Sequence, residues 1–273
     1  MNDDVIITAY VVIDDMMKHL GHQSHVLAQV SDAEVLTVAV AAAQFFHNNH
    51  EAALGIVTRA GYLSGRLSVS RCNRRRHQLA DWLPLILEAL GALFARGEAF
   101  ILNSMPLPIC KRVRARHCRK VRGRDYCGCG AAKKEKFFGW RLHLVCTPQG
   151  VPVSFTMLPG GYHDLTPVHQ LTAALPAGAK VFGDKGYHSA NDEASILKDV
   201  GVRLIPIRKK HMTPHEWADE FDLRRYRKTI ETVNSQLERM GIEQLYARSN
   251  AGFDIKVHAS LLALAWPVFR DAV

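Results

Sequence analysis

The spacing of apolar residues changes near residue 98, and this change most limits the folds open to the chain. Before it, residues 31–46 and 81–96 carry apolar residues at helical spacing. Ser31 and Glu34 form a capping box at the start of the first of these helices. After residue 98, short apolar runs bounded by turn residues predict strands instead. The sequence therefore predicts a helical N-terminal part followed by a part built around a sheet.

The second part predicts five strands with helices between the later ones. We expect the strands at residues 100–103, 137–147, 151–158, 180–184 and 202–207. The Pro-Gln-Gly turn at 148–150 joins the second and third strands into a hairpin. Three strands followed by strand, helix, strand and helix is the order of an RNase H-like fold. We therefore predict an α/β protein: an RNase H-like mixed five-stranded sheet flanked by helices, preceded by an all-helical domain. The predicted domains are residues 1–97 and 98–273.

The positive charge of the chain is concentrated after its first 66 residues. The net charge is +9, whereas residues 1–66 hold seven acidic and three basic residues, a balance of −4. Such a basic body favours a polyanionic partner, most simply nucleic acid, although a generic basic surface explains it about as well. Within the segment 66–79, the four arginines between positions 71 and 76 suit the second helix of a helix-turn-helix on DNA, or a solvated basic face. These are Arg71, Arg74, Arg75 and Arg76.

A second group of basic residues follows the first predicted strand, in a basic loop at residues 111–136. Its position next to a strand end suits contacts with substrate phosphates. The residues proposed for these contacts are Arg112, Arg114, Arg116, Arg119, Lys120, Arg122, Lys133 and Lys134. Lys185, Arg227 and the neighbouring segment 224–228 extend the same basic character.

The cysteines and the N-terminus predict a reduced, cytoplasmic protein. His117, Cys118, Cys127 and Cys129 lack the paired C-x2-C spacing of strong zinc sites, so ordinary thiols are expected and zinc is left open. The acidic start MNDDVIITAY is unlike a secretory signal, and the longest apolar run is too short to span a bilayer. No membrane partner is expected. When bound to DNA, the protein would be associated with the nucleoid.

Three polar residues occupy positions that suggest chemistry. Asp184 ends the fourth strand, before Lys185 and Gly186, where α/β sheets place ligand groups. Glu231 lies within a long helix, and its pairing with Arg227 at i,i+4 is usually only structural. Asn103 ends the first strand, where a two-metal site built on such a sheet would need a third carboxylate. A further acid, Asp164, is assigned to helix capping, with a role near the site as the minority alternative.

Several motifs in order resemble the DDE transposases of bacterial insertion sequences. They are KKEKFFGWRLHLV, GGYHD at 160–164, DKGYHS at 184–189 and RKTIETVNSQLERM at 227–240. The resemblance implies that positions 103, 184 and 231 are catalytic and hold two Mg²⁺ or Mn²⁺ ions, with aspartate as the family's residue at position 103. It also implies double-stranded DNA partners, namely transposon terminal inverted repeats and target DNA. The reaction would cleave the element ends and join the freed 3′-OH ends to target DNA, and a homodimer on DNA follows from joining two ends together.

Asn103 changes what the resemblance implies for this chain. An amide is isosteric with a carboxylate but neutral, and it coordinates Mg²⁺ poorly beside phosphate. The sequence therefore predicts a transposase that binds DNA but is impaired in catalysis. Two alternatives stay open: an RNase H-like nuclease or resolvase that cuts without joining, and a non-catalytic DNA-binding protein derived from a transposase.

Overall fold

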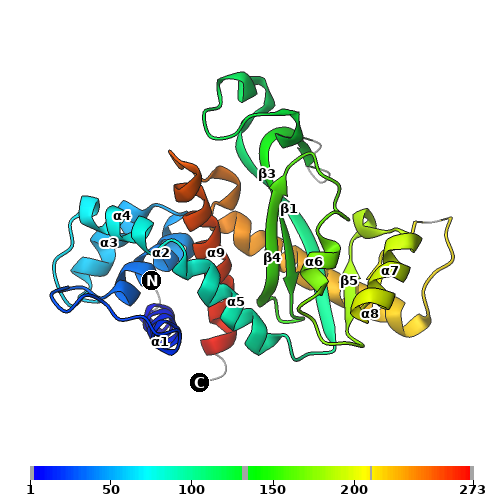
Figure 1. Ribbon diagram of the computed structural model, residues 1–273, viewed down its shortest axis with the longest axis horizontal. Coiled ribbons are helices and arrows are strands. Elements are labelled where there is room, and N and C mark those ends of the chain that lie inside the picture. The colour runs from blue at the N-terminus through cyan, green and yellow to red at the C-terminus, as the bar shows by residue number, and fades with distance from the viewer. Residues whose placement is uncertain (1–2, 131–134, 210, 271–273) are drawn as a thin grey trace. The chain divides into compact units, whose positions relative to one another are not determined.

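The chain forms two compact units (Figure 1). The computed structural model describes residues 3–130, 135–209 and 211–270. The helical unit comprises Met1–Ala89 and Gln236–Val273, and the sheet unit comprises Leu90–Ser235. Whether residues 1–97 and 98–273 fold as separate domains stays a prediction. Within the described residues, no helix has the length and apolar character needed to cross a membrane.

The helical unit is built around one buried helix. Its elements are α1 (Asp3–His19), α2 (Asp32–Phe46), α3 (His50–Arg59), α4 (Val69–Gln78), the start of α5 (Trp82–Phe94), the 3-10 helix η4 (Ile242–Gln244) and α9 (Asn250–Arg270). Every residue of α2 from Val35 to Ala43 is buried, and the helix packs against α1, α3 and α9. The predicted capping box is confirmed: Ser31 accepts from the Glu34 amide, and Glu34 accepts from the Ser31 amide.

A buried asparagine ties the early and late parts of this unit together. Asn48 follows α2 with a positive φ of 62°, a conformation that asparagine tolerates better than most residues. Its Nδ2 donates to the Met240 carbonyl at 2.9 Å and to Ser260 Oγ at 3.0 Å. Residues after 235 are therefore integral to the packing of the N-terminal helices.

The sheet unit has a mixed sheet of six strands, one more than predicted. The strands are β1 (Ala99–Lys111), β2 (Cys127–Gly130), β3 (Glu135–Cys146), β4 (Pro152–Pro159), β5 (Lys180–Gly183) and β6 (Arg203–Pro206). The predicted hairpin is confirmed, because β3 pairs antiparallel with β4. The additional strand, β2, lies inside the basic loop and pairs with the start of β3. Its four residues, CGCG, carry no apolar alternation that could have predicted a strand.

Strands β1, β5 and β6 are parallel neighbours, and β3 lies antiparallel on the other side of β1. Helices cover both faces of this sheet (Figure 1). On one face, Phe100 and Leu102 pack with Leu171 of α6 (Val168–Thr172) and Ile196 of α7 (Ala190–Val200). On the other face, Phe182 and Ile205 pack against Leu223 and Tyr226 of α8 (Trp217–Arg239).

Strand β1 is much longer than the predicted strand 100–103. Pro106 and Pro108 were expected to stop it, but it continues to Lys111. Proline is tolerated where its missing N–H has no partner, as at a sheet edge or a bulge. Beyond Leu102 the parallel partner β5 has ended, and the ladder with β3 shifts register after Pro108. The prolines therefore occupy the part of β1 that is paired along one side only.

Two helix starts also differ from the predictions. Helix α8 begins at Trp217, eight residues before the predicted start at 225, since Asp219 is buried and holds its first turn. Asp164 does not cap a helix, because α6 begins later, after Pro167, and has no side-chain cap. Helix α7, by contrast, has a side-chain cap, because Ser189 accepts from the Asp192 amide.

Candidate functional site

The end of the β1–β5 ladder places Asn103 and Asp184 next to each other along the sheet. Asn103 was predicted to end its strand but lies within β1, which continues to Lys111, whereas Asp184 directly follows β5. Leu102 is paired with Gly183 in the parallel ladder, so Asn103 and Asp184 are the residues that follow the last pair. Side chains two residues apart on a strand share a face. Asp184 therefore lies on the face of Phe182, which packs against α8.

Helix α8 contacts β1 through an amide pair. Asn103 Nδ2 donates to Asn234 Oδ1 at 2.5 Å. Asn234 follows Glu231 by three residues, so the two side chains lie on the same side of α8, about one turn apart. The hydrogen bond that holds Asn103 therefore joins two uncharged amides, and it forms without a metal ion.

Asp184 and Glu231 make local contacts. Asp184 is exposed at the N-cap of the 3-10 helix Lys185–Tyr187, where its Oδ1 accepts from the Lys185 amide at 2.7 Å. Glu231 is 66% exposed and pairs with Arg227, Nε to Oε1, at 3.2 Å. Among the described residues, the polar contact of Glu231 is with Arg227 rather than with Asn103 or Asp184. An exposed i,i+4 pair of this kind contributes little to stability.

These residues do not fit a pair of divalent cations as they stand. A two-cation site of this kind is built from three carboxylates that converge on the ions. The part of the chain that the structure describes contains no group of three or more His, Cys, Asp or Glu side chains that could hold a metal. This holds for the Cys/His segment at 117–129 as well as for the strand ends. At position 103 the structure places an amide whose nitrogen already donates to Asn234.

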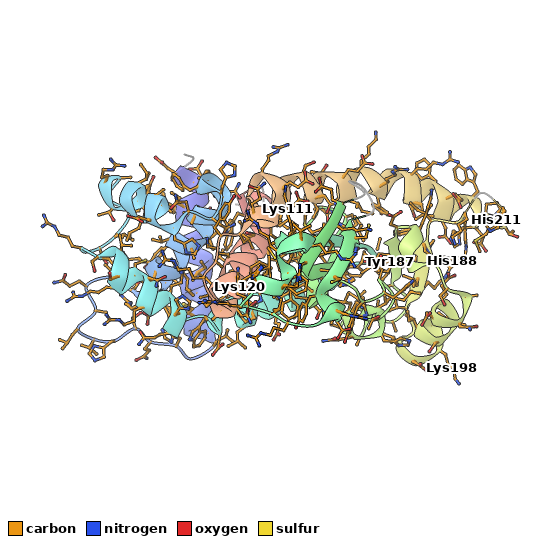
Figure 2. All side chains as sticks on the ribbon, turned by 90° about the horizontal axis from the view of Figure 1, so that it is seen from above. Lys111, Lys120, Tyr187, His188, Lys198 and His211 are labelled. Carbon is orange, nitrogen blue, oxygen red and sulfur yellow. The ribbon has the colours of Figure 1, made fainter. Side chains whose placement is uncertain are left out.

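A cluster of polar side chains lies on the other face of the sheet, opposite the face that α8 covers. Ser104 Oγ donates to Asp164 Oδ1 at 3.1 Å, and Arg141 Nη1 lies 3.5 Å from the same oxygen. His143 is paired with Ser104 across the β1–β3 ladder, and burial lowers its pKa to about 4. Tyr187 is fully buried, which raises its pKa (Figure 2). We call these residues the rear cluster: Ser104, Arg141, His143, Asp164 and Tyr187.

The rear cluster links the segments that carry Asn103 and Asp184. Ser104 directly follows Asn103 on β1. Asp164 lies over the turn that follows Asp184, since a Cβ on Gly186 would come 2.7 Å from Asp164 Oδ2. From the sequence a role for Asp164 near the site was only the minority alternative to helix capping, because its contacts join residues 60 positions apart. The GGYHD and DKGYHS motifs were the available signals, as they contain Asp164 and Tyr187.

The four arginines around α4 divide into two outward and two inward residues. Arg71 and Arg74 are exposed. Arg75 forms an ion pair with Asp32 and donates to the Val30 carbonyl at 2.7 Å. Arg76 is buried, which lowers its pKa, and it donates to Asn73 Oδ1.

The connection between α3 and α4 spans residues 60–68, longer than the helix-turn-helix turn of about three or four residues. Of the four arginines around α4, Arg75 and Arg76 make their contacts within the protein, whereas Arg71 and Arg74 expose their charge to solvent.

The basic loop contains two short helices besides β2. They are the 3-10 helices η1 (Arg112–His117) and η2 (Arg124–Tyr126). Five of its predicted DNA contacts are exposed: Arg112, Arg114, Arg116, Arg119 and Arg122. Lys120 is half-buried (Figure 2), and Lys133 and Lys134 lie outside the described residues. The exposed guanidinium groups therefore cluster within eleven residues that directly follow β1.

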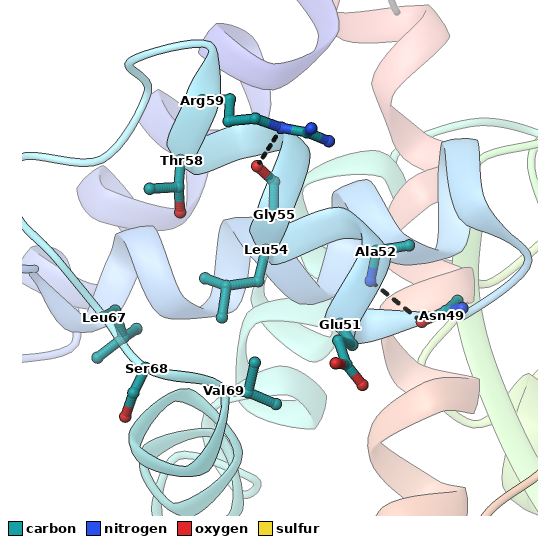
Figure 3. A pocket seen from close by; sticks show the side chains of 10 residues that line it. All are labelled: Asn49, Glu51, Ala52, Leu54, Gly55, Thr58, Arg59, Leu67, Ser68 and Val69. Carbon is teal, nitrogen blue, oxygen red and sulfur yellow. Dashed lines mark hydrogen bonds between the residues drawn. The ribbon is translucent and has the colours of Figure 1, made fainter.

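A pocket of about 670 Å³ lies in the helical unit, between α3 and the segment that leads into α4 (Figure 3). Its lining includes Leu54, Leu67 and Val69, together with Asn49, which caps α3 by accepting from the Ala52 amide. None of the predicted catalytic residues lines it. The chemistry predicted from the sequence therefore resides in the sheet unit and not in this pocket.

Comparisons with known proteins agree with the motifs in the sheet unit. The family described as the transposase DDE domain matches residues 95–250, more than half of the chain. No curated protein matches the chain. Among solved structures, a similar chain is the Mos1 transposase in a paired-end complex with the left transposon end, at 13% identity. The alignment covers 81% of each chain with a TM-score of 0.27, which is too low to indicate a shared fold.

Proposed function

Because the chain belongs to the DDE transposase family, we propose that it is a transposase that binds DNA but, as written, does not cleave it. The observation that carries this proposal is the amide pair between Asn103 and Asn234. It lies where the β1–β5 ladder ends, at the position where the resemblance to bacterial insertion-sequence transposases expects a metal-binding aspartate. In this proposal the sheet is RNase H-like, and positions 103, 184 and 231 descend from a three-carboxylate site.

The amide differs from a carboxylate in both charge and hydrogen-bonding role. A carboxylate only accepts hydrogen bonds, whereas Asn103 donates one to Asn234. A neutral residue here also removes one of the negative charges that would attract divalent cations. Members of the family generally use divalent metal ions. We therefore propose that Asp184 and Glu231 alone hold Mg²⁺ or Mn²⁺ too weakly for phosphoryl transfer.

The proposed DNA contacts rest on charge rather than on cavities. Exposed arginines between 112 and 122 follow the candidate site directly along the chain, and Arg71 and Arg74 offer a second basic face in the helical unit. Such contacts bind phosphates without reading bases, so affinity should fall steeply with salt. Terminal inverted repeats and target DNA are the proposed partners, and a homodimer on DNA is the proposed working form.

The experiment restores the carboxylate. Asn103→Asp is incubated with a supercoiled plasmid that carries the coding sequence and its flanking DNA, in Mg²⁺ or Mn²⁺. We expect nicking by this variant and at least about 100-fold less by the chain as written, since even outer-shell partners of a metal change activity about 10- to 100-fold. The double variant Asn103→Asp/Asp184→Asn is the matched control and should not nick.

Four outcomes would count against the proposal. Equal nicking by the chain as written would show that Asn103 is compatible with catalysis. A silent Asn103→Asp variant that still binds DNA would favour a non-catalytic DNA-binding protein. Nicking without any joining of 3′-OH ends to a second plasmid would favour a nuclease or resolvase. Absence of DNA binding by every form would reject the function as a whole.

A further inference from the structure

The first half of α8 exposes an aromatic pair that the proposed catalytic site does not use. Trp217 is 80% exposed and Phe221 is 55% exposed. Their rings are stacked, with centroids 5.6 Å apart and an interplanar angle of 21°. Large aromatic side chains normally bury most of their surface, so an exposed pair of this kind marks an interaction site.

The opposite face of the same helix is firmly held, so the aromatic pair is not exposed by fraying. Asp219 is buried between Lys180 Nζ at 2.7 Å and Arg203 Nη2 at 3.1 Å. One turn further on, Leu223 packs with the strand residues Phe182 and Ile205. Figure 2 shows the start of α8 beside the labelled His211. The helix therefore presents Trp217 and Phe221 from a fixed platform.

The aromatic pair continues into a row of cations along one side of α8. At 100° per residue, Trp217, Phe221, Arg224 and Lys228 fall within about 60° of the helix circumference. All four are exposed, and we call them the α8 stripe. Glu231, the proposed third acid, continues the same line one turn later. At 1.5 Å per residue, the aromatic pair begins about 21 Å from Glu231 along the helix axis.

We propose that the α8 stripe binds unpaired bases of a DNA strand whose backbone leads to the candidate site, an inference that rests on the proposed function. Arg224 and Lys228 contact phosphates, and the rings of Trp217 and Phe221 stack with bases. Aromatic stacking accepts every base, and it requires bases that are not already stacked within a duplex. The ligand class is therefore single-stranded DNA, or the frayed end of a duplex.

Charge argues for a nucleic acid rather than a second copy of the chain. Arg224 and Lys228 are like charges at i,i+4, which repel each other on an isolated helix. A second copy would bring the same cations against this row, whereas a phosphate backbone neutralises it. Arg225 adds to the positive side of the helix, where its guanidinium lies 5.7 Å from the Tyr226 ring.

The test compares one oligonucleotide in single-stranded and duplex form. Fluorescence anisotropy gives the affinity of the full chain for each, without metal. The variant Trp217→Ala/Phe221→Ala should lose roughly 5- to 100-fold in single-strand affinity for each stacked base that is lost, and less than about threefold for duplex. Trp217→Phe keeps a ring and should restore most of the affinity. Arg224→Gln should instead reduce the salt dependence of both affinities.

The intrinsic fluorescence of Trp217 provides a direct readout. Single-stranded DNA should quench tryptophan emission in the chain as written, and Trp217→Phe should abolish that part of the quenching. Because both rings are exposed, the double variant should keep its thermal melting temperature, which checks that it folds. Equal losses for single strand and duplex, or no loss for either, would overturn the inference.

A change from dimer to monomer in sedimentation of the double variant, without a selective loss for single strands, would also overturn it in favour of a second copy. Failure of the proposed function looks different, because the unaltered chain would then bind neither form of DNA.

Discussion

Replacing Asn103 by aspartate should destabilise the metal-free sheet unit and make it respond to Mg²⁺. The two residues that follow the β1–β5 ladder are Asn103 and Asp184, on strands about 5 Å apart. Two carboxylates at that separation repel by about 1–3 kcal/mol when the effective dielectric constant lies between that of a protein surface and that of water. The shape is unchanged, and Asn234 can turn its amide to donate to the new carboxylate. The repulsion is therefore the main new contribution to the free energy of unfolding.

The loss should appear as a lower melting temperature only where both acids are ionised. At about 2–4 °C per kcal/mol for a unit of this size, the expected decrease is roughly 2–12 °C near neutral pH with EDTA present. Repulsion raises the pKa of at least one carboxyl in the folded state, so the destabilisation is present above that pKa. It should vanish as the pH falls towards about 4 and the pair becomes protonated.

Mg²⁺ should reverse the effect in the variant alone. A cation that binds only the folded state adds about 2.7 kcal/mol at a concentration 100 times its dissociation constant. Scanning calorimetry of the chain as written, of Asn103→Asp and of the matched control Asn191→Asp tests this. Asn191 is exposed in the first turn of α7 and lies outside the β1–β5 ladder, so the control adds the same charge away from the paired strands. Equal melting in EDTA, or equal Mg²⁺ shifts in all three proteins, would refute the reasoning.

Two further predictions concern the rear cluster. Asp164→Asn removes the charge that faces Arg141 and should cost about 1–3 kcal/mol of stability. This cost should exceed that of Asp192→Asn in the first turn of α7. Urea unfolding measures both, and equal costs would contradict the bracing role of Asp164. His143 is buried with its pKa lowered to about 4, so the unfolded chain takes up a proton that the folded chain does not between about pH 6.5 and 4. Stability should therefore fall across that window by up to about 3 kcal/mol from this residue. His143→Leu should flatten the pH dependence measured by thermal melts, while His258, whose pKa is also lowered to about 4 by desolvation, keeps contributing its own part.

Features set by local sequence were predictable. The Ser31–Glu34 capping box, the hairpin of β3 and β4, and Ser189 as the cap of α7 all depend on residues a few positions apart. Asp184 at a strand end could be placed for the same reason, since an apolar run and a glycine turn mark where the strand stops.

Features set by distant partners were not. The continuation of β1 past Pro106 depends on which of its edges is paired, and the pairing residues are about 35 positions away. Asp164 was interpreted as a helix cap because its partners, Ser104 and Arg141, are far along the chain. That Asn234, and not Glu231, reaches Asn103 depends on the rotation of α8 against the sheet, which spacing within the helix does not determine.

The bonds of Asn48 have a consequence for the order in which the protein can fold during synthesis. Its side chain binds the Met240 carbonyl and Ser260, so the packing of the helical unit includes residues made about 190 positions later. The sheet unit, by contrast, is one continuous stretch and can fold as soon as it leaves the ribosome. During synthesis, the apolar surface of α2 that packs against α9 therefore stays uncovered until α9 has been made. A truncated product that ends before residue 236 would retain a complete sheet unit beside an unfinished helical one.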